Sequence, residues 1–332
     1  MGILVNGKWR SDETFPTTAE GAFVRRDSAF RNWVTRDGSP GPAGEGGFRA
    51  EPGRYHLYVS LACPWAHRTL IFRKLKRLDD AVSVSVVDPF MGDQGWAFSA
   101  PDGSITPGST SDHIRNAEFL YEIYAKADAG YSGRVTVPVL YDKETRMIVN
   151  NESAEIIRML NSAFDQWGDA SLDFYPRDLR GEIDRINAAV YDNVNNGVYK
   201  AGFATAQHAY EAAFDALFRT LAAIETLLSS QRYLAGDRVT EADWRLFTTL
   251  VRFDAVYYSH FKCNLRRIID YPNLWIYTRD LYQAPGVADT VSLEQIKRHY
   301  YSSHVRINPT RIVPKGPAID FAAPHDRALK FA

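Results

Sequence analysis

The length, composition and charge of the chain exclude several classes of protein. Its 332 residues suggest about two domains, and an apolar share of 45% with 24% charged residues is typical of a globular protein that buries a sizeable core. The formal net charge of −1 gives no overall attraction to nucleic acid or to an anionic membrane surface.

The first 50 residues are predicted to form an extension with little regular structure. Short apolar pieces alternate with Gly and Pro, and residues 37–47 have the composition of a loop. The first residues lack the basic segment and long apolar run of a signal peptide. No apolar run reaches the roughly 20 residues of a membrane span. We therefore expect a cytoplasmic protein with no membrane partner.

Cys63 lies between a strand-like run and a helix-like run. Apolar residues alternate from Tyr55 to Leu61, which is typical of a strand, and those of 70–78 share one helical face. Pro64 suits the first helical position, where its missing N–H costs nothing. Cys63 is therefore predicted at a helix N-terminus, where unpaired N–H groups and the helix dipole stabilise a thiolate.

The motif Cys63-Pro64-Trp65-Ala66 contains a single thiol. Redox proteins with a C-x-x-C motif resolve a mixed disulfide with their second cysteine, whose position is Ala66 here. A mixed disulfide at Cys63 therefore needs an external thiol, and glutathione is the abundant cytosolic one. Lone cysteines are more often buried structural residues, so the functional interpretation depends on the helix-start context. Cys263 lacks that context and is interpreted as structural.

A second strand is predicted at 81–87, parallel and adjacent to the first, because a β-helix-β unit crosses over in this way. Residues 88–113 form an irregular insertion that holds Trp96. A helix is expected at about 114–127.

A hairpin follows, with strands at 135–141 and 146–149, and a helix at 154–161 is started by Asn151-Glu152-Ser153. The order β-α-β-α-β-β-α is typical of a thioredoxin-like domain. A proline that enters the third strand of that fold is cis, so we expect a cis bond at Val137-Pro138. The alternative is an ordinary edge-strand proline.

From about residue 179 the pattern is almost entirely helical, with helices expected at 183–194 and 213–228. Thr240-Glu241-Ala242-Asp243 is a capping box that starts a further helix. The sequence therefore predicts an all-helical domain packed on a thioredoxin-like one, followed by a tail that contains proline.

Four features together resemble the soluble glutathione transferases. They are a Cys-Pro turn between a strand and a helix, a Val-Pro pair before the third strand, a Glu-Ser pair at the next helix start, and a helical domain with a capping box. Within that family, Cys63-Pro64-Trp65-Ala66, the insertion with Gly95-Trp96, and His260-Phe261-Lys262-Cys263-Asn264 are similar to the glutathionyl-hydroquinone reductases, the Xi class. The resemblance covers about residues 20–310. It implies the glutathione transferase fold and a homodimer.

The predicted fold class is an α/β thioredoxin-like N-terminal domain plus an all-α C-terminal domain. The expected boundaries are an extension at 1–50, a glutathione-binding domain at 51–165 with its insertion around 88–113, a substrate-binding domain at 175–301, and a tail at 302–332.

The resemblance also implies which residues bind glutathione. The backbone of Val137 pairs with the middle of the tripeptide, and Glu152 pairs with its ammonium group. The γ-glutamyl carboxylate sits at the helix N-terminus, where N–H donors and the Ser153 hydroxyl converge. Trp96 stacks on the tripeptide and Arg134 makes charge-assisted hydrogen bonds with it.

Three tyrosines are expected to line the acceptor pocket and to hydrogen-bond the hydroquinone oxygens. The resemblance places this role on Tyr199, Tyr257 and Tyr300. Because tyrosines also follow two of them directly, Tyr258 or Tyr301 remains open as the true contact.

The implied activity is the reduction of S-glutathionyl-hydroquinones to hydroquinones through a Cys63–glutathione mixed disulfide, with glutathione as co-substrate. No metal, nucleotide or nucleic acid is expected, since the sequence has no P-loop, no dinucleotide-binding glycine motif and no clustered His ligands. An omega-like thiol transferase or dehydroascorbate reductase would share Cys63 without needing the tyrosines. A non-enzymatic interaction module of the same architecture would generally lose the cysteine.

Overall fold

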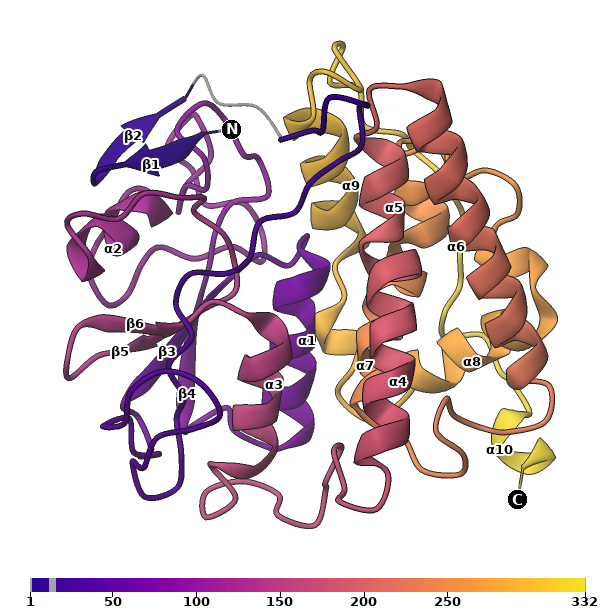
Figure 1. Cartoon of the computed structure of the whole chain (residues 1–332), viewed down its shortest axis with the longest axis horizontal. Coiled ribbons are helices and arrows are strands. Elements are labelled where there is room, and N and C mark those ends of the chain that lie inside the picture. Colours follow the sequence, from indigo (N-terminus) through magenta and orange to yellow (C-terminus); the bar gives the residue numbers. More distant parts are fainter. Residues whose placement is uncertain (1, 12–15, 332) are drawn as a thin grey trace. The chain divides into compact units, whose positions relative to one another are not determined.

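The computed structural model describes residues 2–11 and 16–331 of the chain (Figure 1). The described residues divide into two compact units, and each is described by itself. The first unit consists of 2–11, 27–172 and 290–303, and the second of 16–26, 173–289 and 304–331. Each unit is therefore built from segments that are far apart in the sequence.

A four-stranded mixed sheet forms the centre of the first unit. The strand order is β4-β3-β5-β6, with β3 parallel to β4, antiparallel to β5, and β5 antiparallel to β6. Parallel pairing of the first two strands and the antiparallel hairpin were both predicted, and both are confirmed. The strand bounds are Tyr55–Val59 for β3, Val82–Val86 for β4, Val139–Asp142 for β5 and Met147–Asn150 for β6.

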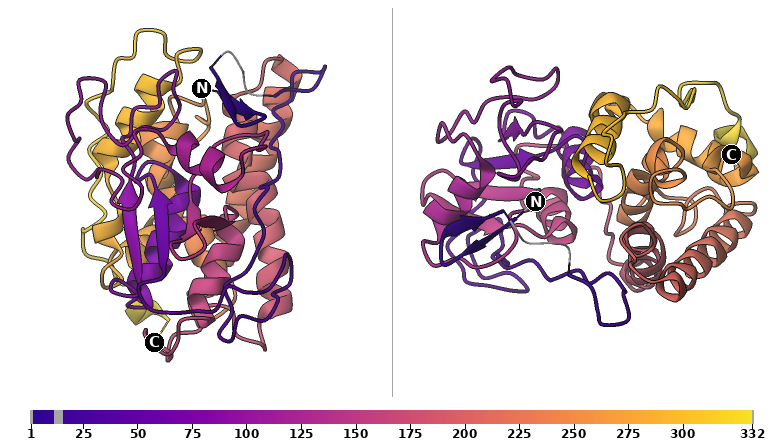
Figure 2. Two further views of the ribbon diagram at one scale, coloured as in Figure 1. Left: turned by 90° about the vertical axis from the view of Figure 1, so that its left-hand side faces the viewer. Right: turned by 90° about the horizontal axis from the view of Figure 1, so that it is seen from above.

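Three helices of the first unit pack around this sheet. Helices α1 (Pro64–Leu75) and α3 (Ser153–Ser162) contact each other on one side of it, and α2 (Leu120–Ala127) lies on the other (Figures 1 and 2). The strands are buried almost throughout because helices cover both faces. A further helix of this unit, α9 (Leu293–Ser303), comes from near the end of the chain.

Helix α2 is shorter than the sequence pattern predicts. The helix expected from residue 114 begins at Leu120, because the carboxylate of Asp112 accepts hydrogen bonds from the backbone N–H groups of Ile114 and Ala117 at 2.9 and 3.0 Å. Asn116 has a φ of 51°, which a right-handed helix does not allow. An aspartate-capped turn has replaced the first part of the predicted helix.

The N-terminal residues form a short hairpin where the composition predicts little regular structure. Strand β1 (Ile3–Val5) pairs antiparallel with β2 (Lys8–Arg10). Leu4 and Gly133 exchange backbone hydrogen bonds of 2.9 Å, which attach the hairpin to the first unit.

The second unit is helical. Two of its helices are followed by single π-helical turns, η1 (Tyr191–Asn195) and η2 (Phe253–Tyr257), and short 3₁₀ turns occur at Ile268–Asp270 and Ala288–Thr290. No helix in the described part of the chain is both long enough and apolar enough to cross a membrane. The α-helices are α4 (Arg180–Val190), α5 (Gly197–Gly202), α6 (Gln207–Leu227), α7 (Glu241–Arg252), α8 (Pro272–Tyr282) and α10 (Arg327–Lys330).

The predicted capping box starts α7, and its carboxylate does more than cap the helix. Asp243 accepts hydrogen bonds from the backbone N–H of Thr240 at 2.7 Å and from that of Leu234 at 2.9 Å. It also accepts one from the hydroxyl of Tyr277 at 2.8 Å. This buried carboxylate therefore joins α7, the preceding turn and α8.

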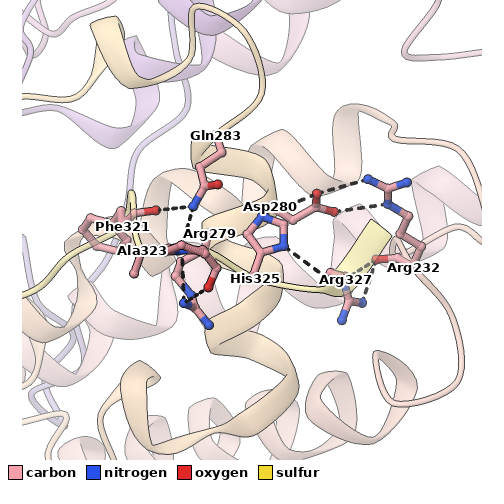
Figure 3. A network of polar contacts seen from close by, with 9 residues as sticks. Arg232, Arg279, Asp280, Gln283, Phe321, Ala323, His325 and Arg327 are labelled. Atoms are coloured by element: carbon pink, nitrogen blue, oxygen red, sulfur yellow. Dashed lines mark hydrogen bonds and ion pairs between the residues drawn. The ribbon is translucent and has the colours of Figure 1, made fainter. Parts of the chain in front are cut away.

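The C-terminal tail is fastened to the second unit by a polar network (Figure 3). The buried guanidinium of Arg327 donates to the carbonyl of Arg232 at 2.7 Å, beyond the C-terminus of α6. Arg232 in turn pairs with Asp280 on α8. The side-chain amide of Gln283 donates to the carbonyl of Phe321 at 2.9 Å. The tail is thus an ordered part of the helical unit.

Candidate active site

Cys63 is the N-cap residue of α1, with Pro64 as the first helical residue. The thiol is partly exposed, and its Sγ–H donates to the carbonyl oxygen of Val137 at 3.5 Å. The carbonyl of Cys63 accepts from the N–H of His67 and so begins the helical hydrogen bonds at 3.0 Å. The sulfur therefore lies at the positive end of a 12-residue helix, a setting that favours a thiolate.

The bond between Val137 and Pro138 is cis, as the sequence predicts. Both residues are buried, and the chain enters β5 directly after them. The half-buried Arg134 lies three residues earlier, and its carbonyl accepts a hydrogen bond from the hydroxyl of Tyr131 at 2.9 Å. The cis-proline loop thus brings the backbone carbonyl of Val137 against the thiol of Cys63.

Glu152 and Ser153 begin α3, as predicted. Glu152 is the N-cap residue, and its carboxylate accepts from the N–H of Ala154 at 3.1 Å and from the hydroxyl of Ser28 at 3.0 Å. Ser153 is buried, and the guanidinium of Arg68 donates to its hydroxyl at 3.4 Å. A buried cation beside a helix N-terminus favours an anionic group there.

The cis-proline loop and the start of α3 are joined by a tyrosine that sequence reasoning did not single out. The hydroxyl of Tyr124 donates to the carbonyl of Thr136 at 2.8 Å and accepts from the side-chain amide of Asn151 at 3.1 Å. Burial raises the pKa of Tyr124, so the hydroxyl stays protonated. These bonds fix the residue before Val137 relative to the residue before Glu152.

Trp96 lies in the insertion and is buried, and its indole stacks on the ring of His299 with centroids 4.8 Å apart and an interplanar angle of 21°. Nδ1 of His299 donates to the carbonyl of Pro89 at 2.8 Å, which holds the imidazole in place. Tyr300, the next residue on α9, is buried and also belongs to the first unit. Sequence reasoning had no signal for the pairing of Trp96 with His299.

Tyr199 and Tyr257 lie together in the second unit. Their ring centroids are 6.0 Å apart, and both rings contact Phe261, at 5.5 and 5.6 Å. Tyr199 is on α5 and Tyr257 ends the π-helical turn η2. Both are buried, whereas Tyr258 is half-buried.

The predicted site residues are thus distributed over both units. Tyr199 and Tyr257 belong to the second. The first holds the other seven, namely Cys63, Trp96, Arg134, Val137, Glu152, Ser153 and Tyr300.

Cys263 has none of the features of Cys63. It is fully buried, and burial raises the pKa of its thiol. Its Sγ–H faces the carbonyl of Phe261 at 3.8 Å. These observations favour the structural interpretation of this cysteine.

Two protein-family models match the chain. Residues 62–163 match the glutathione S-transferase N-terminal domain, and residues 207–279 match the glutathione S-transferase C-terminal domain. The first match covers α1, α2, α3 and strands β4, β5 and β6, and the second lies within the helical unit, from α6 into α8.

Curated relatives match over nearly the full length. The glutathionyl-hydroquinone reductase YqjG of Escherichia coli K12 is 56% identical over 331 residues, which is 100% of both chains. The glutathionyl-hydroquinone reductase PcpF of Sphingobium chlorophenolicum is 52% identical over 96% of this chain and 97% of its own.

Solved structures agree with these relatives. The glutathione-bound structure of Escherichia coli YqjG superimposes with a TM-score of 0.91 at 54% identity, covering 99% of this chain and 100% of that one. A Xi-class glutathione transferase from Natrialba magadii gives a TM-score of 0.90 at 49% identity, covering 100% and 98%.

Proposed function

Because the chain belongs to the glutathionyl-hydroquinone reductases, the Xi class of the glutathione transferases, we propose that it reduces S-glutathionyl-hydroquinones to hydroquinones with glutathione as the reductant. The observation that carries the proposal is the placement of Cys63 at the start of α1, against the carbonyl of Val137. Because Ala66 replaces a second cysteine in the motif, a glutathione bound at Cys63 is released by an external thiol.

Glutathione binds along the cis-proline loop and the start of α3 in this proposal. The backbone of Val137 pairs with the middle of the tripeptide, and Glu152 takes the ammonium group. The γ-glutamyl carboxylate lies at the N-terminus of α3 beside Ser153, supported by the nearby charge of Arg68. Trp96 and Arg134 complete the glutathione site, the first by stacking and the second by charge-assisted hydrogen bonds.

The reaction has two thiol–disulfide steps. In the first, the thiolate of Cys63 attacks the sulfur of the conjugate, a disulfide forms, and the bond from sulfur to the ring carbon breaks. The electron pair of that bond goes to the ring carbon, which takes up a proton and leaves as part of the hydroquinone. In the second, the thiolate of another glutathione attacks the mixed disulfide, which frees Cys63 and gives glutathione disulfide.

The first step needs a proton donor because a ring carbon is a poor leaving group. We assign this donation and the orientation of the ring hydroxyls to Tyr199, Tyr257 and Tyr300. A reducing compartment such as the cytoplasm, and a homodimer, complete the proposal. The compartment supplies the free glutathione that the reaction consumes, and the homodimer is what the resemblance to the glutathione transferases implies.

The test is glutathione-dependent release of hydroquinone from S-glutathionyl-menadiol, followed by chromatography. The native protein, Cys63→Ser and the matched control Cys263→Ser are compared. Release by the native protein and the control, but not by Cys63→Ser, supports the proposal. A native protein that takes up glutathione at Cys63 and releases no hydroquinone acts instead as a general thiol transferase.

A further inference from the structure

A segment of the N-terminal extension is docked on the helical unit. The backbone N–H of Thr205 donates to the carbonyl of Gly21 at 2.9 Å. Gly21 has a φ of +80°, and a Cβ there would lie 2.7 Å from the Cβ of Ala206, so no other residue fits without a shift. Residues 16–26 belong to the second unit for this reason. No role was assigned to these residues from the sequence.

An aromatic contact continues the docking toward the candidate tyrosines. Phe23 is buried, and its ring centroid lies 5.5 Å from that of Phe203. The ring of Phe203 lies 6.0 Å from that of Tyr199. The contacts of Gly21 and Phe23 therefore hold the segment beside the ring pair of Tyr199 and Tyr257.

Arg25 contacts the rings of Phe23 and Tyr199 and the side chain of Asn196, the residue just before the helix that carries Tyr199. Its guanidinium carbon lies 4.9 Å from the centroid of Tyr199. Its Nε donates to the side-chain oxygen of Asn196 at 2.8 Å. The carbonyl of Asn196 accepts from the N–H of Tyr199 at 3.0 Å, and Asn196 joins the π-helical turn η1 to α5. Such π-helical turns occur frequently at functional sites.

We propose that Arg25 is a positioning residue for the acceptor tyrosine Tyr199. The inference rests on the proposed function, because it concerns one of the three tyrosines to which that function assigns proton donation and orientation of the ring. A guanidinium stacked on the ring and held by Asn196 sets the ring plane and therefore the direction of the O–H bond. Its positive charge also stabilises the negative charge that develops on the Tyr199 oxygen when the proton moves to the ring carbon of the substrate. Arg25 itself neither gains nor loses a proton.

The experiment compares three single variants in the hydroquinone-release assay. Arg25→Met keeps the length of the side chain and removes the charge and the planar stack, whereas Arg25→Lys keeps the charge alone. Arg26→Met is the matched control, since Arg26 is the exposed neighbour. We expect Arg25→Met to lower kcat about tenfold with little change in KM for glutathione, and Arg25→Lys to recover part of that loss. Arg26→Met should behave as the native protein.

A double-mutant cycle with Tyr199→Phe separates positioning from a general structural role. If Arg25 acts through Tyr199, Arg25→Met changes kcat less than twofold when Tyr199 is already Phe. Formation of the Cys63–glutathione adduct from glutathione disulfide should be unchanged in Arg25→Met, because that step does not use the tyrosine. If Arg25→Met does not fold, Arg25→Lys takes its place in the same cycle.

Two results would overturn the inference while leaving the proposed function intact. One is native kcat in Arg25→Met, and the other is the same fold-loss in the native and Tyr199→Phe backgrounds. A native protein that forms the Cys63 adduct and releases no hydroquinone refutes the proposed function and the inference together. The two sets of results differ, so the experiment shows whether the role of Arg25 or the proposed function is wrong.

Discussion

Removing the hydroxyl of Tyr124 should weaken both the fold and the affinity for glutathione. The change to Phe keeps the ring, which lies 5.7 Å from that of Phe30. It removes the bond to the carbonyl of Thr136 and the bonds from the N–H of Thr136 and the side-chain amide of Asn151. The cis-proline loop and the start of α3 are then no longer joined through a common hydrogen-bonding group.

The magnitude follows from the loss of these bonds. A buried hydrogen bond contributes about 1 kcal/mol to stability, and a buried donor left without an acceptor costs about 1–3 kcal/mol. Asn151 is buried, so its amide cannot turn freely to water. We expect the free energy of unfolding to fall by about 2 kcal/mol.

The assays are urea unfolding and the KM for glutathione in the release reaction. Tyr124→Phe should raise that KM several-fold, because the loop and the helix that we propose bind the tripeptide are no longer joined by this hydroxyl. Tyr121→Phe is the matched control on the same helix, where the ring stacks on Trp9 at 5.0 Å. A stability loss below about 0.5 kcal/mol together with a native KM would refute this reasoning.

Three further predictions concern the capping box of α7, the two cysteines and a buried histidine. Asp243→Ala leaves four buried donors without their acceptor, so urea unfolding should show a loss of about 4 kcal/mol. A loss below about 1 kcal/mol would contradict the role given to the capping box. Iodoacetamide should label native Cys63 and spare Cys263, since burial raises the pKa of the Cys263 thiol; equal labelling rates by mass spectrometry would be incompatible with that burial. Burial lowers the pKa of His56 from 6.5 to about 3, so the unfolded chain binds a proton that the folded chain does not. The free energy of unfolding should therefore fall as the pH drops below about 6.5, and His56→Gln should remove about 2 kcal/mol of the loss measured between pH 6.5 and 5; an unchanged slope would contradict it.

Features with short-range causes could be predicted from the sequence. The turn at Cys63 follows from a strand, a proline and a helix that are adjacent in the chain. The capping box at Thr240 spans four residues, and Glu152-Ser153 starts α3 by the same local chemistry. The cis bond before Pro138 was predicted from the order of elements, which identifies the fold.

Features that depend on contacts between distant residues could not be predicted. Tyr124 reaches Asn151 across 27 positions, and His299 stacks on Trp96 although 203 positions separate the two residues. Arg25 likewise meets Tyr199 only once the extension is docked. Periodicity describes one element at a time and carries no information about such pairs.

The late start of α2 is an intermediate case. The apolar spacing favoured a helix from residue 114, but Asp112 competes for the same backbone N–H groups. Aspartate is known to cap turns in this way. The sequence shows the aspartate, but it does not show whether its carboxylate or a helical carbonyl accepts from the N–H groups of Ile114 and Ala117.

The most direct test of the central claim is a single turnover without free glutathione. The protein is mixed with one equivalent of S-glutathionyl-menadiol, and products and intact protein mass are measured together. The proposed mechanism predicts one equivalent of free hydroquinone and one glutathione bound to Cys63, which added glutathione then releases as its disulfide. Hydroquinone release with no glutathione on Cys63, or the same release by Cys63→Ser, would contradict the proposed mechanism.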